Sequence, residues 1–495
     1  MKISLLYPGT VPDAPDTEVS ERLTGDLMLD ESFSCFFPDI NKRRFFLSVV
    51  SEPQSDPDIP IYRAEILRDF CAKPNLLDGL CAALRKLVKM RDEQQADRTQ
   101  FFTLIRGTDS ESAYITSSGL AEVSSTATNK ALHALSGIGE LLRIYPVQSR
   151  GLAALRDRIT ALSRGEKFAQ LTDLFGLTSH LSFDDTFTLN VKLNEYANVA
   201  LYELTGVVHP VPEEEVTGLR RLFNKRPARD ACSTGIRVDD RWGKLRNELL
   251  GGALRELADL AYAISKAIFD EFVPLLRELH FYEAGAAYVA AMRNKKLPLC
   301  YPEITENGQT KYTELYDLYL CTSYPNAAAI VPNDADLSHG SIIVTGANNT
   351  GKTVFLRSVG TAQLLAQSGL PVIAREATVR MRSGVWTLYA AAEKEFAAGN
   401  DAGRFEQEVR LLSDMLDKIK PGALVLLNEI FQTTAYSEGA EGLHGILRYL
   451  HSPAIGADYI AVTHLTDLIG LLGSNAVHMH TLEGEQIYKL ETVHN

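Results

Sequence analysis

The sequence TGANNTGKTVFLRSVG, residues 345–360, decides the fold of the C-terminal part of the chain. Residues 346–353 match the pattern G-x-x-x-x-G-K-[ST], with the apolar run 341–344 before them and an amphipathic segment after them. This context predicts a strand, a phosphate-binding loop and a helix. A glycine-rich turn with a solvated lysine is the alternative. The match at every position and on both flanks favours the phosphate loop.

Each residue type in this loop suits the binding of ATP with Mg²⁺. Glycines let backbone N–H groups surround phosphate oxygens at a helix N-terminus, where the helix dipole favours an anion. A lysine neutralises the β- and γ-phosphates, and the next hydroxyl ligates Mg²⁺, which assigns these roles to Lys352 and Thr353. The predicted nucleotide-binding residues are Gly346, Asn348, Asn349, Thr350, Gly351, Lys352 and Thr353.

Two later apolar runs end in polar side chains that predict the rest of the site. The first, ALVLLNEI (423–430), ends in Asn428 and Glu429, where an Asp for the metal and a Glu for the attacking water are usual. Asn428 is predicted to contact the metal through a neutral amide oxygen, which leaves metal affinity and turnover open. Glu429 is the predicted base, and the alternative is a buried strand that ends at a surface glutamate.

The run YIAVTH (459–464) ends at His464, where a side chain can orient around the γ-phosphate. A lone histidine is more often structural, but the position at a strand end favours a role in the site. The predicted catalytic residues are therefore Glu429, Lys352 and His464.

Length and composition indicate a multidomain globular protein. The chain has 495 residues, 45% of them hydrophobic, a formal charge of -13 and six scattered cysteines without a C-x-x-C pair. We expect a cytoplasmic protein without a signal peptide or membrane span, whose contacts with nucleic acid are local.

The periodicity predicts an α plus α/β fold. From about residue 60 to 295, apolar residues at three- and four-residue spacing predict a mostly helical region. We expect a break at 106–119 and a boundary or kink at Pro274. After about residue 300, β-branched runs, including AAAIVP (327–332), alternate with helical segments, which indicates a mainly parallel sheet. The predicted domains are an N-terminal extension (1–60), a helical region (61–299) and an ATPase domain (300–495).

Taken together, these segments resemble the ABC-type ATPase domain of the MutS family of DNA mismatch-repair proteins. The resembling segments are VPND (331–334), the loop and its helix (342–374), GRFEQEV (403–409), LVLLNEIFQTTAYSEG (424–439) and AVTH (461–464). Weaker resemblance at 62–70 and 275–304 implies that the helical region is a lever and clamp. The chain departs from the family in its short N-terminal part, so we expect no mismatch-recognition domain.

The resemblance also implies properties of the site. Family members form dimers around two nucleotides, so a homodimer is expected here. Ile330 falls where the family stacks an aromatic ring on adenine, which implies apolar packing on the base. The family's glycine-rich tail after the metal and base residues is replaced by FQTTAYSEG (431–439).

A basic stretch lies where the family's clamp would contact DNA. Residues 220–246 hold nine basic and three acidic residues, a local balance of +6. Clustered positive charge of this kind suits phosphate contacts, and a solvated charged face is the alternative. The predicted DNA-binding residues are Arg220, Arg221, Lys225, Arg226 and Arg229.

The sequence therefore predicts a DNA-binding ATPase whose ATP binding and hydrolysis close a dimer on structured or mismatched double-stranded DNA, read by shape. The alternative is a nucleotide-dependent switch or scaffold with little hydrolysis that binds a protein partner.

Overall fold

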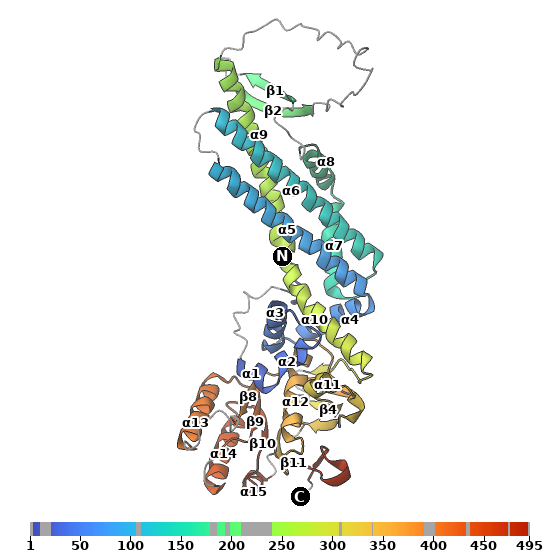
Figure 1. The fold of residues 1–495 in the computed structure, drawn as a ribbon, viewed down its shortest axis with the longest axis vertical. Coiled ribbons are helices and arrows are strands. Elements are labelled where there is room, and N and C mark those ends of the chain that lie inside the picture. The colour runs from blue at the N-terminus through green and yellow to red at the C-terminus, as the bar shows by residue number, and fades with distance from the viewer. Residues whose placement is uncertain are drawn as a thin grey trace. The chain divides into compact units, whose positions relative to one another are not determined.

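The computed structural model describes residues 3–9, 21–104, 110–178, 186–193, 199–208, 240–305, 309–338, 340–390, 401–431, 436–473 and 476–493. Contacts divide the chain into two compact units (Figure 1). Unit 1 contains Met1–Leu77, Val147–Ala154 and Arg277–Asn495, and unit 2 contains Asp78–Pro146 and Leu155–Leu276. The predicted domains are continuous segments, whereas each compact unit combines segments from different parts of the chain. The domain boundaries therefore stay a prediction.

Unit 1 is built on a six-stranded sheet in the order β12-β11-β6-β10-β9-β8. The strands are β6 (Ser341–Thr345), β8 (Val385–Tyr389), β9 (Leu424–Asn428), β10 (Asp458–Val462), β11 (Ala476–Thr481) and β12 (Leu490–Thr492). All adjacent pairs are parallel except β11 with β12. The continuous apolar runs of β6 and β10 are buried throughout, as expected for central parallel strands. The predicted α plus α/β class with a mainly parallel sheet is confirmed.

Helices cover both faces of this sheet. Alternate residues point to opposite faces, and the face that includes Val425, Leu427 and Tyr459 forms one core with α13 (Asp401–Lys418), α14 (Tyr436–Leu450) and α15 (Asp467–Leu472). The other face packs on α12 (Lys352–Gln367), where a Cβ on Gly360 would lie only 2.4 Å from Leu426. The sheet is thereby held between two helical layers (Figure 1).

A second, four-stranded sheet has the order β3-β7-β4-β5. Its strands are β3 (Glu303–Thr305), β4 (Lys311–Leu315), β5 (Asn333–Asp336) and β7 (Glu376–Arg380), and α11 (Leu318–Ser323) follows β4. Asp317 caps α11 and also forms an ion pair with Arg357 of α12 at 2.7 Å. This pair fixes the helix after the phosphate loop to the second sheet.

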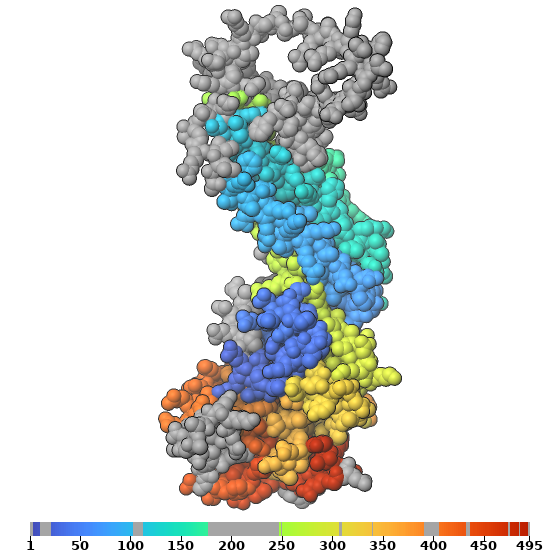
Figure 2. Space-filling model, viewed as in Figure 1, coloured from blue at the N-terminus to red at the C-terminus, as the bar shows by residue number. Residues whose placement is uncertain are grey.

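The N-terminal part of the chain belongs to the same unit as the sheets. It forms α1 (Glu21–Asp26), α2 (Leu29–Ser34), α3 (Ile40–Ser51) and α4 (Asp58–Ala72), and α10 (Pro274–Asn294) belongs to the unit from Arg277 onward. In Figure 2 these N-terminal residues, coloured dark blue, cover part of the residues after 300. Unit 1 therefore includes the N-terminal helices as well as the residues after 300.

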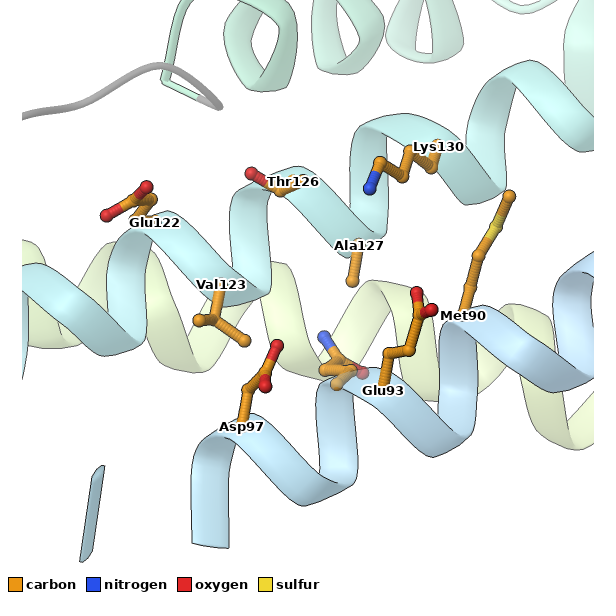
Figure 3. Close-up of a pocket in the computed structure, with 9 residues that line it drawn as sticks. Met90, Glu93, Asp97, Glu122, Val123, Thr126, Ala127 and Lys130 are labelled. Atoms are coloured by element: carbon orange, nitrogen blue, oxygen red, sulfur yellow. The ribbon is translucent and has the colours of Figure 1, made fainter. Parts of the chain in front are cut away.

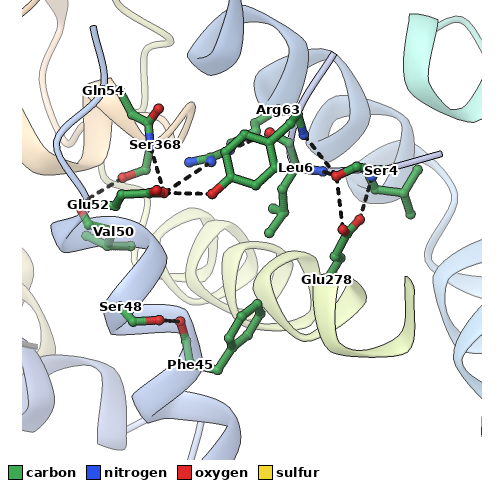
Figure 4. Close-up of polar contacts among 12 residues, drawn as sticks. Ser4, Leu6, Phe45, Ser48, Val50, Glu52, Gln54, Arg63, Glu278 and Ser368 are labelled. Atoms are coloured by element: carbon green, nitrogen blue, oxygen red, sulfur yellow. Dashed lines mark hydrogen bonds and ion pairs between the residues drawn. The ribbon is translucent and has the colours of Figure 1, made fainter. Parts of the chain in front are cut away.

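A buried polar cluster fixes residues 4–6 (Figure 4). Ser4 Oγ and the Leu5 N–H donate to the Glu278 carboxylate at 2.9 and 2.5 Å. Arg63, which is fully buried, donates from Nε to the Leu6 carbonyl at 2.9 Å. Ser368, directly after α12, donates to the Val50 carbonyl at 3.3 Å. The end of α12 that is remote from the phosphate loop is therefore fixed to this cluster.

Unit 2 is formed mainly by long helices. They are α5 (Pro74–Leu104, from Asp78 onward in this unit), α6 (Ser110–Ile144), α7 (Arg150–Ser163, from Leu155 onward), α8 (Glu166–Thr178) and α9 (Asp240–Phe272). The helices α6 and α9 pack through Leu120, Leu254 and Ala258, and Thr128 donates to the Ala261 carbonyl at 2.7 Å. An antiparallel pair, β1 (Thr186–Leu193) and β2 (Val199–Val208), interrupts the helices.

The structure corrects two local predictions and confirms a third. The break predicted at 106–119 is wrong from Ser110 onward, because α6 begins there and its buried Ser117 and Ser118 pack despite low helix propensity. The run 327–332 is not a strand: Ala327–Ala329 form a 3₁₀ turn capped by Asn326. Pro274 is a boundary as predicted, since α9 ends at Phe272 and α10 begins at Pro274.

Candidate nucleotide site

Three neighbouring parallel strands bring the predicted site residues to one edge of the sheet. The strand β10 lies between β6 and β9, and all three end at the same edge. Lys352 follows β6, Asn428 ends β9, Glu429 follows it, and His464 follows β10. Ligands of open α/β sheets bind at this carboxyl edge.

The loop between β6 and α12 has the backbone that a phosphate cradle requires. Gly346 has a φ of 140°, and a Cβ there would lie 1.9 Å from the Thr481 hydroxyl oxygen, so any other residue would be strained and would displace Thr481. Gly351 has a φ of 93° and begins α12 without a side-chain cap. The first N–H groups of a helix have no partner within it, so they are available as donors to a phosphate anion.

The side chain of Lys352 lies folded inside this loop. It is buried, and its Nζ donates to the carbonyls of Gly346 and Ala347 at 3.0 and 2.7 Å. Burial lowers the pKa of Lys352, while Glu429, whose Oε1 lies 3.8 Å from Nζ, acts in the opposite direction. A bound phosphate chain would stabilise the charged amine, so the loop fits a nucleoside phosphate.

Thr353 and Asn428 form the predicted metal pair. The Thr353 hydroxyl donates to Asn428 Oδ1 at 3.0 Å, which joins the start of α12 to the end of β9. Hydroxyl and amide oxygens beside the Glu429 carboxylate are the hard ligands that Mg²⁺ takes, so the residues fit the ion. With Asn at 428 the pair contributes no negative charge of its own.

Glu429 is held at the end of β9 in an unusual conformation. Its φ is 56°, and its N–H donates to the Val462 carbonyl of β10 at 2.9 Å. Its Oε1 lies 3.1 Å from His464 Nε2. Both side chains keep partial exposure, 27% for Glu429 and 33% for His464, so a water molecule can reach the carboxylate. The pair can position a water and accept its proton.

The other predicted residues lie at different places. Ile330 is buried, and the segment that follows it in sequence contacts the chain before β12. In that contact Asn333 donates to the Tyr488 carbonyl at 2.9 Å. Tyr488 in turn borders Gly351. Asn348 and Asn349 lie in the loop, and Asn349 has a φ of 61°. The predicted DNA-binding residues Arg220, Arg221, Lys225, Arg226 and Arg229 lie outside the described residues.

Sequence reasoning missed two residues that support the site. Thr481, at the end of β11, lies 2.8 Å from the Thr350 hydroxyl and closes one side of the loop. Glu408, on α13, accepts a hydrogen bond from the Phe431 N–H at 2.9 Å, directly after the turn that carries Glu429. Glu408 could have been found from its place in the family-like segment 403–409. No sequence pattern pointed to Thr481.

A separate pocket lies in unit 2, outside this site. Residues of α5 and α6 line it, including Glu93, Asp97, Glu122 and Lys130, and its volume is about 200 Å³ (Figure 3). Within the described ranges, no three His, Cys, Asp or Glu side chains are grouped to hold a metal ion. No helix of the described chain is both long and apolar enough to cross a bilayer.

Comparison with known proteins gives the family. The model of MutS domain V matches residues 342–492, and the model of the MutS2 N-terminal domain matches residues 55–295. The protein named Endonuclease MutS2 from Halalkalibacterium halodurans is 31% identical over 346 residues, 68% of this chain and 40% of the relative. The DNA mismatch repair protein MutS from Synechococcus sp. is 30% identical over 204 residues, 39% of this chain and 23% of the relative.

The protein of the same name from Shouchella clausii is 28% identical over 261 residues, 50% of this chain and 28% of the relative. The matched part is thus less than half the length of each of these relatives. The two family models cover the helical region and the nucleotide site separately, in the order in which they occur along this chain. The chain therefore belongs to the MutS family.

Proposed function

We propose that this chain is a DNA-associated ATPase that binds ATP and Mg²⁺ and closes as a homodimer on structured or mismatched double-stranded DNA. The observation that carries the proposal is the convergence of Lys352, Glu429 and His464 at one sheet edge, with Glu429 Oε1 3.8 Å from the amine and 3.1 Å from the imidazole. Family membership supports the association with DNA. The proposed location is the cytoplasm.

The proposed roles follow from the contacts. Lys352 and the first N–H groups of α12 bind the phosphates, and Thr353 with Asn428 holds the ion or its bound water. When bound, Mg²⁺ neutralises the charge on the phosphates. Glu429 accepts the proton of the attacking water, and His464 orients the carboxylate through Nε2. Ile330 is proposed to pack on the base, and the basic stretch around Arg221 is proposed to contact DNA phosphates.

A second candidate function is a nucleotide-dependent switch or scaffold that binds a protein partner. Asn428 favours it, because an amide in place of a carboxylate weakens the attraction for Mg²⁺ and slows turnover. In that case ATP binding alone closes the dimer. The two candidates share the binding site and differ in hydrolysis.

The deciding experiment is ATP hydrolysis by the purified chain with and without Mg²⁺, in the presence of branched DNA, linear duplex DNA or no DNA. The Lys352→Ala variant is the control, since it removes the loop amine. DNA-stimulated hydrolysis that is lost in the control is expected. Nucleotide binding without Mg²⁺-dependent turnover would reject the ATPase and favour the switch.

A further inference from the structure

The turn after β9 places Glu429 through a backbone that L-residues rarely adopt. Glu429 has a φ of 56° and Phe431 a φ of 63°, two positive values within three residues. Such a conformation persists only where surrounding contacts hold it. Phe431 is the more constrained of the two, because a bulky side chain at positive φ is rare. The position of the Glu429 carboxylate therefore depends on what holds this turn.

Hydrogen bonds anchor the turn at three residues, Asn428, Glu429 and Phe431. The Asn428 carbonyl accepts from the Ala390 N–H, and the Glu429 N–H donates to the Val462 carbonyl, both at 2.9 Å. These two anchors are backbone groups at the ends of neighbouring strands. Beyond Glu429, the Phe431 N–H donates to Glu408 Oε2 at 2.9 Å. This last anchor is a side chain, so one substitution can remove it without disturbing the sheet.

Glu408 belongs to a contact that α13 makes with the turn as a whole. It is 6% exposed, which makes a charge-assisted hydrogen bond to a backbone N–H stronger than one in water. One turn earlier on the same helix, Phe405 packs on Phe431 with ring centroids 5.5 Å apart. A polar and an apolar contact from α13 thus fix Phe431 on both its backbone and its ring.

We infer that Glu408 is a positioning residue: its carboxylate holds the Phe431 N–H and thereby fixes the turn that presents Glu429. The inference rests on the proposed function in one respect, the role of Glu429 as base. Without the anchor the turn relaxes toward negative φ and moves the Glu429 carboxylate away from its water. We expect nucleotide binding to be unaffected, because the Phe431 N–H that Glu408 holds lies after β9 and not in the loop 346–353.

The test compares Glu408→Ala, Glu408→Gln and the control Glu406→Ala. Gln keeps an acceptor oxygen of the same reach, whereas Ala removes it. Glu406 lies on the same helix, is exposed, and pairs only with Arg410 at 3.6 Å among the ion pairs described for it. We expect Glu408→Ala to lower kcat about 10- to 100-fold with the KM for ATP nearly unchanged, and Glu408→Gln to retain most of kcat.

A second readout does not need turnover. Hydrogen exchange of the amides of residues 429–431 is expected to accelerate in Glu408→Ala and to stay slow in Glu408→Gln and Glu406→Ala. Equal kcat for Glu408→Ala and wild type, unchanged exchange, or a parallel loss of nucleotide affinity would each overturn the inference. A wild type that binds ATP without hydrolysing it would reject the proposed ATPase and the catalytic role of Glu408, while faster exchange in Glu408→Ala would still show that Glu408 holds the turn.

Discussion

Asn428 is the neutral member of the proposed metal pair. Its Oδ1 lies 3.0 Å from the Thr353 hydroxyl, so a carboxylate at this position would keep the geometry and add one negative charge. We expect Asn428→Asp to lower the Mg²⁺ concentration for half-maximal ATP turnover by about tenfold, because opposite charges attract more strongly at a partly buried site. The measurement is a Mg²⁺ titration of ATP hydrolysis at saturating ATP. An unchanged titration would mean that metal capture does not limit turnover, which favours the switch.

Gly346 is fixed by two independent constraints, a positive φ and the Thr481 side chain. Gly346→Ala would place a Cβ 1.9 Å from the Thr481 oxygen, and it is expected to lower the free energy of unfolding by about 2 to 3 kcal/mol and to abolish ATP binding. Gly422→Ala is the matched control, because Gly422 has a φ of 80° with nothing within 4 Å of the added Cβ.

The control gives the cost of an L-residue at positive φ without a close contact, which is about 1 to 2 kcal/mol. Urea unfolding and equilibrium binding of a fluorescent ATP analogue measure both effects. Equal destabilisation by the two substitutions would show that contact with Thr481 contributes nothing to the constraint at Gly346.

The helices α3 and α10 are joined by an ion pair whose strength depends on pH. Glu283 of α10 lies 2.9 Å from Lys42 Nζ and 2.7 Å from His280 Nδ1. Burial acts to raise the pKa of Glu283, but hydrogen bonds from His280 and Lys42 outweigh it and lower that pKa to about 2. A carboxyl whose pKa is depressed by folding stabilises the fold above its unfolded pKa of about 4.5 and loses that contribution as the pH falls toward 2.

Glu283→Gln is therefore expected to lower the free energy of unfolding at pH 7 by about 1 to 2 kcal/mol and to flatten its decline below pH 4.5. Glu314→Gln is the control: Glu314 pairs with Arg375 at 2.6 Å, but both side chains are exposed, so solvent screens the pair. Urea unfolding between pH 3 and pH 7 measures both variants. A pH dependence identical to that of the wild type would contradict the assignment to Glu283.

Features that depend on neighbouring residues could be predicted from the sequence, whereas contacts between segments far apart in the chain could not. The loop 346–353 is a continuous pattern with a defined backbone, so its place between β6 and α12 could be predicted. The placement of Asn428 and His464 at one edge of the sheet could be predicted, because apolar runs mark strands and parallel strands end at one edge. The contact of Thr481 with the loop could not be predicted. It depends on the pairing of β11 with β6, and strand order does not follow from the local spacing of residue types. The start of α6 at Ser110 was missed because packing, not propensity, decides it.

The candidate nucleotide site and the stretch expected to contact DNA fall in different compact units. Unit 1 contains the strands and α12 together with the N-terminal helices, whereas residues 220–246 belong by sequence to unit 2. The net charge of -13 opposes binding to DNA, so a local basic stretch must supply the attraction. If that stretch contacts phosphates, its removal should weaken DNA binding without affecting nucleotide binding in unit 1.

We therefore expect simultaneous substitution of Arg221, Lys225 and Arg226 by Glu to weaken duplex binding and to reduce the dependence of log K on log salt by about 0.9 for each DNA phosphate that the protein no longer neutralises. The control substitutes Lys311, Lys418 and Lys420 by Glu, three exposed residues of unit 1, and changes the total charge equally. Fluorescence anisotropy over a salt series measures K for both variants, and ATP affinity is measured in parallel. Equal weakening in both variants would assign the effect to total charge; unchanged binding in the first would exclude the basic stretch as the DNA-binding segment and leave a protein partner as its candidate ligand.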